Sequence, residues 1–258
     1  MRDPGTVRLF HTDHGSGDIV LLLVHGWGGD GREWSPHVEA LAGRHRVIVP
    51  DLRGHGRSDV PAEDNTPRAM ARDLAALIAR LAAGPVVAVG HSMGGQVVNL
   101  LAVEHPEAIH SVIALDPAHG ADGDEVADIP RRLRTYQANG ATAAAEFVAA
   151  AFSPNAPTGL RTAHVRTMLG TPDHVIVQAY AGMYTDRRAV GIREHSEAYL
   201  RLRKCPALTV WTSAAHADWE GGLRLPGARV EHWPGVGHYL HEERFTETVR
   251  LIEQWSGR

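Results

Sequence analysis

The stretch GHSMGG at residues 90–95 decides the fold of this chain. It follows an apolar run at residues 85–89 that predicts a buried strand, and it precedes residues 96–104, which predict a helix. A Ser between glycines at such a junction matches the pattern G-x-S-x-G, in which a sharp, strained turn projects the hydroxyl away from the backbone. The positive end of the following helix faces charge that develops there. Ser92 is therefore our candidate nucleophile.

The rest of the chain has to support this interpretation, because a Gly-rich turn with an incidental Ser would carry the same letters. A nucleophilic Ser in this pattern needs an acid and then a His further along the chain. Both residue types follow Ser92, and the order of the surrounding elements indicates which of them lie close to it.

Composition describes an ordinary soluble domain. The chain has 258 residues, is 43% hydrophobic and 22% charged, and carries a formal net charge of −4. This charge gives no electrostatic case for nucleic acid or acidic lipid as a partner. The single cysteine, Cys205, allows no internal disulfide, and no apolar run reaches the length of a membrane span. We expect a cytoplasmic protein with no membrane anchor and with Cys205 as a structural thiol.

Strands alternate with helices along most of the chain, which predicts a parallel sheet covered on both faces. Besides the strand before Ser92, apolar runs predict strands at residues 18–25, 46–50, 111–115, 206–211 and 228–232. Further helices are predicted at residues 33–41, 68–81 and 245–255.

Residues 119–202 interrupt this alternation, since they are rich in Ala and predict several helices and no strand. The candidate helices are 125–138, 142–152, 159–169, 174–183 and 187–200. An insertion between two strands of such a sheet is expected to cover its carboxyl edge, where ligands bind. We therefore divide the chain into a core domain, residues 1–118 and 203–258, and a helical cap, residues 119–202.

Four motifs in a fixed order give the chain a resemblance to a known family. They are HGWG at 25–28, DLRGHGRS at 51–58, GHSMGG at 90–95 and GVGH at 235–238. With these motifs the chain resembles the α/β-hydrolase fold superfamily, in particular its Ser-nucleophile esterase- or lactonase-like enzymes with a helical cap. The resemblance spans residues 18–256 and implies a mostly parallel central sheet flanked by helices.

The resemblance also implies an oxyanion hole and a catalytic base. The two oxyanion donors are the backbone N–H groups of Trp27 and Met93. The base is His238, which sits on a Gly-rich loop from which its ring can approach Ser92. Three other histidines compete for that role with less suitable positions, in a helix start, inside a strand and beside the nucleophile: His241, His232 and His91.

The acid departs from the usual pattern of the superfamily. Most relatives place it in a Gly-x-x-Asp turn after the strand that matches residues 208–211, but residues 212–218 here read TSAAHAD, without the Gly and with a late Asp. A minority place it one strand earlier, where this chain has Asp116. We predict Asp116 as the acid and Asp218 as the runner-up, while a loop-capping role would also place an Asp at position 116.

A Ser at the elbow argues against the superfamily's haloalkane dehalogenases and epoxide hydrolases, which use Asp there. We expect a serine hydrolase that cleaves a carboxylic ester or lactone with an apolar or aromatic acyl part, through a Ser-His-Asp triad and an acyl-enzyme. The partner is a small-molecule substrate, no cofactor is needed, and the chain acts as a monomer or homodimer. Candidate substrate-binding residues are Trp27, His91, Met168, Tyr180, Met183 and Tyr184.

Two other functions fit the same motifs. Some relatives are cofactor-independent dioxygenases that cleave N-heteroaromatic, hydroxyquinolone-like substrates with a His-Asp dyad. The placement of Asp116 suits that chemistry, although residues 28–31, GGDG, lack a His that such enzymes can carry there. The second alternative is a ligand-binding receptor of the same fold, which would retain the triad.

The 17 histidines raise the question of a metal. No H-E-x-x-H motif and no Cys/His cluster is present, so the sequence predicts no dedicated metal site. The close pairs His11/His14 and His238/His241 are better explained by surface or catalytic roles.

Overall fold

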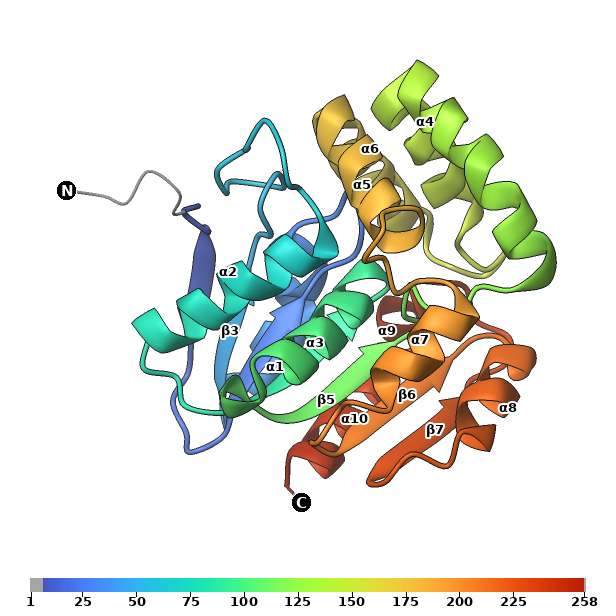
Figure 1. The fold of residues 1–258 in the computed structure, drawn as a ribbon. Coiled ribbons are helices and arrows are strands. Elements are labelled where there is room, and N and C mark those ends of the chain that lie inside the picture. The colour runs from blue at the N-terminus through green and yellow to red at the C-terminus, as the bar shows by residue number, and fades with distance from the viewer. Residues whose placement is uncertain (1–6, 258) are drawn as a thin grey trace.

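One seven-stranded sheet forms the centre of the molecule (Figure 1), as seen in the computed structural model, which describes residues 7–257. The strand order is β1-β3-β2-β4-β5-β6-β7. All neighbouring strands are parallel except β1, which pairs antiparallel with β3. The strands are β1 His11–His14, β2 Val20–Val24, β3 Arg46–Pro50, β4 Val86–His91, β5 Ile109–Leu115, β6 Ala207–Trp211 and β7 Ala228–His232.

Helices cover both faces of this sheet (Figure 1). Helices α2 and α3 pack on one face, while α1 and α10 pack on the other. The α-helices of the sheet-covering layers are α1 Ser35–Leu41, α2 Pro67–Arg80, α3 Met93–Glu104, α8 Ala214–Gly222, α9 Leu240–Glu243 and α10 Phe245–Ser256. Two short 3-10 helices complete them, η1 Gly31–Trp34 and η2 Pro106–Ala108.

The central strands are apolar along their whole length because both faces are buried. In β2, Leu21 and Leu23 pack into the core on the α1/α10 face, whereas Val20, Leu22 and Val24 pack into the core on the α2/α3 face. This alternation is the two-residue period of a strand. Burying one such Leu contributes roughly 2 kcal/mol, so the run at residues 18–25 favours a central strand.

Strand β1 and helix α8 were not predicted from the sequence. Strand β1 is a short edge strand of four residues, and its polar, half-exposed side chains give no apolar run. Helix α8 begins at the Ser213 N-cap, within the segment 212–218 that carries the runner-up acid Asp218. Ser213 accepts a hydrogen bond from the backbone N–H of His216, which is the usual start of a helix.

The segment between β5 and β6 holds four helices and no strand, namely α4 Gly123–Ala150, α5 Thr158–Leu169, α6 Asp173–Tyr184 and α7 Arg193–Leu200. We call these four the helical insertion. Two of the predicted helices join as α4, with Gly140 at the junction in a left-handed conformation (φ 51°). Figure 1 shows α4, α5 and α6 grouped beyond one end of the sheet, next to the ends of the central strands.

Within residues 7–257, no helix is long and apolar enough to span a bilayer.

Candidate active site

Ser92 occupies a strained turn between β4 and α3. Its φ of 52° and ψ of −119° lie in a region that residues with a side chain rarely adopt. A Cβ atom at Gly90 would overlap the carbonyl oxygen of Gly94, and one at Gly94 would overlap the carbonyl of Val24. Close backbone packing therefore requires the two glycines of the G-x-S-x-G pattern, and Ser92 stands between them at the strained position of the turn.

His238 and Asp116 form the shortest link in the site. Nδ1 of His238 lies 2.6 Å from Oδ2 of Asp116, which directly follows β5 and has a φ of 43°. Oδ1 of Asp116 accepts two hydrogen bonds of 2.9 Å, from the backbone N–H and the hydroxyl of Thr212. Burial alone would raise the pKa of Asp116, but the hydrogen bonds from His238 and Thr212 outweigh it and hold that pKa below its ordinary value. The carboxylate is thus ionised and oriented toward the imidazole.

Ser92, Asp116 and His238 all line one cavity of about 260 Å³. Among the residues that the structure describes, no hydrogen bond joins the Ser92 hydroxyl to His238. Catalytic hydrogen bonds of this kind are often long in unliganded enzymes and shorten when substrate binds. The three predicted triad residues therefore meet in one place, with the His–Asp half already hydrogen-bonded.

Asp218, the runner-up acid, does not reach this cavity. It lies exposed on α8, and its side chain is absent from the cavity wall. Because residues 214–222 form a helix instead of an open turn, the late Asp of the TSAAHAD segment is carried away from His238. Thr212, at the start of that segment, contributes to the site through Asp116.

The backbone N–H groups of Trp27 and Met93 remain available as donors. Met93 is the first residue of α3, where a helix has no internal acceptor for the N–H, and no hydrogen bond among the described residues uses either group. The Trp27 side chain is fixed by a 3.1 Å hydrogen bond from Nε1 to the carbonyl oxygen of Ile176 in α6. Its ring packs edge-on against Tyr136 at a centroid distance of 4.9 Å.

The helical insertion supplies much of the cavity wall. Four predicted substrate-binding residues line the cavity, namely Trp27 of the core and Tyr180, Met183 and Tyr184 of the insertion. Burial raises the pKa of both Tyr180 and Tyr184, so their hydroxyls stay protonated and neutral. The wall thus combines aromatic surface with neutral hydrogen-bonding groups.

Two predicted substrate-binding residues, His91 and Met168, do not line the cavity. Met168 is buried and packs against Gly28, where a Cβ would overlap its sulfur. His91 points to the far side of the turn, where it contacts Glu33 and the carbonyl of His238, and burial lowers its pKa. His91 was predicted to bind substrate because it precedes Ser92 in the chain. Neighbouring side chains along a strand point to opposite faces, so the two side chains do not share a cavity.

Sequence reasoning missed a stripe of cavity residues on α4. These residues recur at helical spacing on one face of the helix, and they are Glu125, Ile129, Arg132 and Tyr136. Their helical spacing could be seen in the sequence. Spacing alone, however, does not show whether such a helix face lines a cavity or packs in a core, because that depends on the elements opposite it. His216 of α8 faces them and forms an ion pair with Glu125, with Nε2 3.3 Å from Oε2.

Comparison with known protein families identifies the family of this chain. The family model described as alpha/beta hydrolase fold matches residues 19–166, which include the HGWG and GHSMGG motifs. The chain belongs to the alpha/beta hydrolase fold family. The predicted fold is confirmed by this match and by the seven-stranded, mostly parallel sheet.

Curated relatives named as a lipase and a hydrolase match less than half of the chain. A lipase of Mycobacterium tuberculosis is 38% identical over 117 residues, covering 44% of this chain and 43% of the lipase. The 2-(acetamidomethylene)succinate hydrolase of Mesorhizobium japonicum is 35% identical over 114 residues, covering 44% of this chain and 41% of that enzyme. The chain therefore matches less than half the length of these curated relatives.

Solved alpha/beta hydrolase structures match nearly the whole chain. A malate-bound thermophilic esterase from Thermogutta terrifontis has a TM-score of 0.83 and 27% sequence identity. The match covers 98% of this chain and 94% of the esterase. The helical insertion is thus included in the structural similarity, although the sequence matches to curated relatives cover less than half of the chain.

Proposed function

We propose that the chain is a serine hydrolase that cleaves a carboxylic ester or lactone with an apolar or aromatic acyl part. The observation that carries this proposal is the 2.6 Å hydrogen bond between His238 and Asp116, which line one cavity together with Ser92. Relatives named as a lipase and an esterase support the reaction class.

The proposed reaction follows from these positions. His238, with Nδ1 donating to Asp116, presents Nε2 as the base that takes the proton of the Ser92 hydroxyl as it attacks the acyl carbon. The N–H groups of Trp27 and Met93 stabilise the oxyanion, and losing one such donor typically costs about 3–4 kcal/mol of transition-state stabilisation. His238 then protonates the leaving alcohol, and water attacks the acyl-enzyme by the reverse path.

The cavity limits the substrate to a small molecule. Its volume of about 260 Å³ lies just below the usual range for drug-sized ligands, roughly 300–1,000 Å³. Ile129, Phe147 and Met183 offer apolar surface to the acyl group. We propose that residues 119–202 act as a cap over the core formed by residues 1–118 and 203–258, because α4 and α6 contribute so much of the wall.

The test is hydrolysis of a panel of aryl esters and lactones by the wild type and by Ser92→Ala, together with labelling by a fluorophosphonate. We expect turnover and a single label on Ser92, both abolished by Ser92→Ala. The matched control is Ser213→Ala, which removes another Ser hydroxyl from the same cavity wall and should leave labelling intact. Tight ligand binding without any turnover would instead favour the receptor interpretation.

A cofactor-independent dioxygenase is the second candidate function. It is favoured by one observation, since its His–Asp dyad is the hydrogen-bonded half of this site whereas Ser92 makes no hydrogen bond to His238. The expected result for a hydrolase is no oxygen uptake with a hydroxyquinolone. Uptake that survives in Ser92→Ala would overturn the hydrolase proposal.

A further inference from the structure

Three buried side chains from separate segments meet behind the nucleophile turn. They are Glu33 of η1, His91 at the end of β4 and His241 of α9, with 6%, 1% and 0% of their surface exposed. One oxygen of Glu33 and one ring nitrogen of each His all lie within 4.8 Å of one another. None of the three side chains lines the cavity that contains Ser92.

One ring nitrogen of His91 donates a hydrogen bond, and the other is a hydrogen-bond acceptor that lies against an oxygen of Glu33, which is also an acceptor. Its Nε2 lies 3.0 Å from the carbonyl oxygen of His238, which only accepts, so Nε2 carries the proton. The neutral ring then has its lone pair on Nδ1, which lies 3.2 Å from Oε1 of Glu33. Two lone pairs at this distance repel each other unless a positively charged species, a proton or a metal ion, lies between them.

The surroundings of His241 favour a metal ion over a proton at this position. Its Nε2 lies 3.5 Å from the same Oε1 of Glu33, and neither of its ring nitrogens has a hydrogen-bond partner within the described residues. Oε2 of Glu33 is equally buried and unpartnered. A proton between Glu33 and His91 would leave His241 with only its long 3.5 Å contact to Glu33, whereas a metal ion engages all three side chains at once.

The two distances from Oε1 of Glu33 match the edges of a tetrahedral zinc site. Ligand atoms about 2.1 Å from a zinc ion lie about 3.4 Å apart along a tetrahedral edge. The two measured edges are 3.2 Å, to Nδ1 of His91, and 3.5 Å, to Nε2 of His241. The Nε2–H of His91 donates to a backbone carbonyl, which is the common outer contact of a His that binds metal through its other nitrogen.

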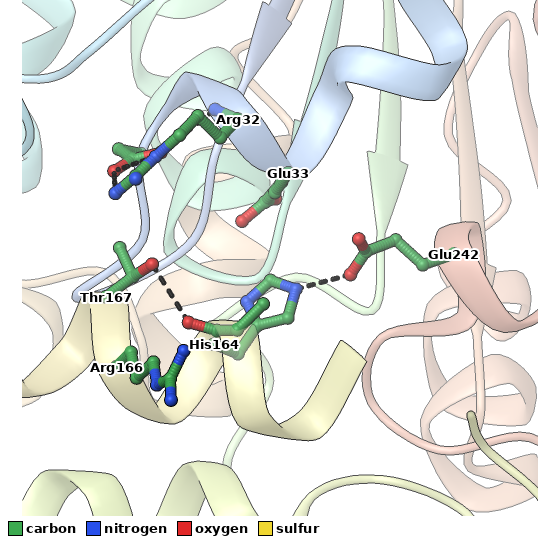
Figure 2. Close-up of a pocket in the computed structure, with 8 residues that line it drawn as sticks. Arg32, Glu33, His164, Arg166, Thr167 and Glu242 are labelled. Carbon is green, nitrogen blue, oxygen red and sulfur yellow. Dashed lines mark hydrogen bonds and ion pairs between the residues drawn. The ribbon is translucent and has the colours of Figure 1, made fainter. Parts of the chain in front are cut away.

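A second cavity borders this cluster at Glu33. It has a volume of about 410 Å³, and Figure 2 shows Glu33 together with His164 and Glu242, which form an ion pair below it. The remaining labelled residues of its wall are Arg32, Arg166 and Thr167. Of the three ligands, Glu33 lines this cavity, so the cluster lies directly beside it.

We propose that Glu33, His91 and His241 form a binding site for Zn²⁺. Two imidazoles and one carboxylate are a donor set that zinc uses in proteins, with water completing the tetrahedron. The ion would join the three segments that carry the predicted catalytic groups, since Glu33 follows the oxyanion loop, His91 precedes Ser92 and His241 follows His238. Its role is to fix these segments relative to one another.

The sequence predicted no metal site because the ligands stand at positions 33, 91 and 241, far apart in the chain. Of the pair His238/His241, the structure brings only His241 to this cluster. Short motifs such as H-E-x-x-H detect ligands on one helix, and they do not detect ligands from three segments.

The experiment uses the full chain, stripped with a chelator and then titrated with Zn²⁺ or Co²⁺. We expect one equivalent of zinc by mass spectrometry, a higher unfolding temperature with zinc, and the visible absorption of tetrahedral Co²⁺. His241→Gln should weaken zinc binding roughly tenfold or more. The matched control is His164→Gln, which removes the neighbouring His–Glu pair and should bind zinc like the wild type.

The proposal is overturned if the stripped wild type binds no stoichiometric zinc and its unfolding temperature does not respond, which would mean that a proton occupies the cluster. It is equally overturned if His164→Gln loses the zinc while His241→Gln keeps it. Should His241→Gln fail to fold, zinc-edge X-ray absorption of the wild type decides, since two imidazoles must be among the ligands. None of these measurements depends on hydrolytic turnover, so this proposal and the proposed function fail separately.

Discussion

Asp116 reaches the imidazole of His238 from the end of β5, with Oδ2 2.6 Å from Nδ1. The neighbouring strand β6 ends at Trp211, and Thr212 just beyond it donates two hydrogen bonds to the other oxygen of Asp116. Thr212, directly after β6, therefore orients the carboxylate of Asp116, which directly follows the neighbouring strand β5.

Replacing Asp116 with Asn tests the role of this carboxylate. Asp116→Asn removes the acceptor that fixes the tautomer of His238, and a loss of about 10⁴-fold in kcat is the usual consequence in triad enzymes. Asp218→Asn serves as the control, because Asp218 is exposed on α8 and should be replaceable without effect. Steady-state hydrolysis of the best aryl ester measures both. Near-normal kcat in Asp116→Asn would reject the assignment.

The hydroxyl of Thr212 should make a smaller contribution to the same reaction. Thr212→Val keeps the shape and the backbone hydrogen bond but deletes the 2.9 Å bond from the hydroxyl to Asp116. A net loss of about 1 kcal/mol corresponds to a decrease of roughly fivefold in kcat, with KM unchanged. Thr185→Val is the control, since that hydroxyl bonds only to the carbonyl of Ala181. An equal decrease in both variants would show that the effect is not specific to Asp116.

The sequence predicted most of the fold because its signals are local. The strand before Ser92 is a continuous apolar run, and the G-x-S-x-G turn admits only small residues beside the strained Ser. Both properties can be seen in a short window of sequence. Strand β1 could not be predicted in this way, because an edge strand with half-exposed polar residues has no apolar period.

The site was less predictable where it depends on contacts between distant segments. Asp116 could be predicted as the acid because it directly follows a predicted strand, whereas the contact of Thr212 with Asp116 requires knowing that β5 and β6 are neighbours. Arg132 and His216 line the same cavity from α4 and α8, which lie far apart in sequence. The direction of the His91 ring toward Glu33 depends on η1, which no pattern around Ser92 encodes.

Glu220 should be important for stability. This buried carboxylate accepts hydrogen bonds from the Thr209 hydroxyl at 2.7 Å and Trp211 Nε1 at 2.9 Å, and it pairs with His119 Nε2 at 3.3 Å. Glu220→Ala leaves these three groups buried and unpaired, so we expect a loss on the order of 3 kcal/mol in the free energy of unfolding. Urea denaturation measures it, with Glu39→Ala at an exposed position as the control. Equal stability of the two variants would contradict this account.

His216 should make stability depend on pH near neutrality. The hydrogen bond with Glu125 raises the pKa of His216, with Asp116 adding to the effect while burial and Arg193 oppose it. A group whose pKa is higher in the folded state stabilises the fold fully below its unfolded pKa, about 6.5 for His, and this contribution is lost as the pH rises through the folded pKa. The free energy of unfolding should therefore decrease from about pH 6 to about pH 8.5.

The decrease should be less than about 1 kcal/mol, because more than half of the Glu125 side chain is exposed and water screens the pair. Urea midpoints at the two pH values measure it. Both His216→Gln and Glu125→Gln should flatten the dependence, since either change removes the ion pair between α8 and α4. His232→Gln, at an exposed position of β7, should leave the dependence as in the wild type. A wild-type slope that persists in His216→Gln would assign the pH dependence to another group.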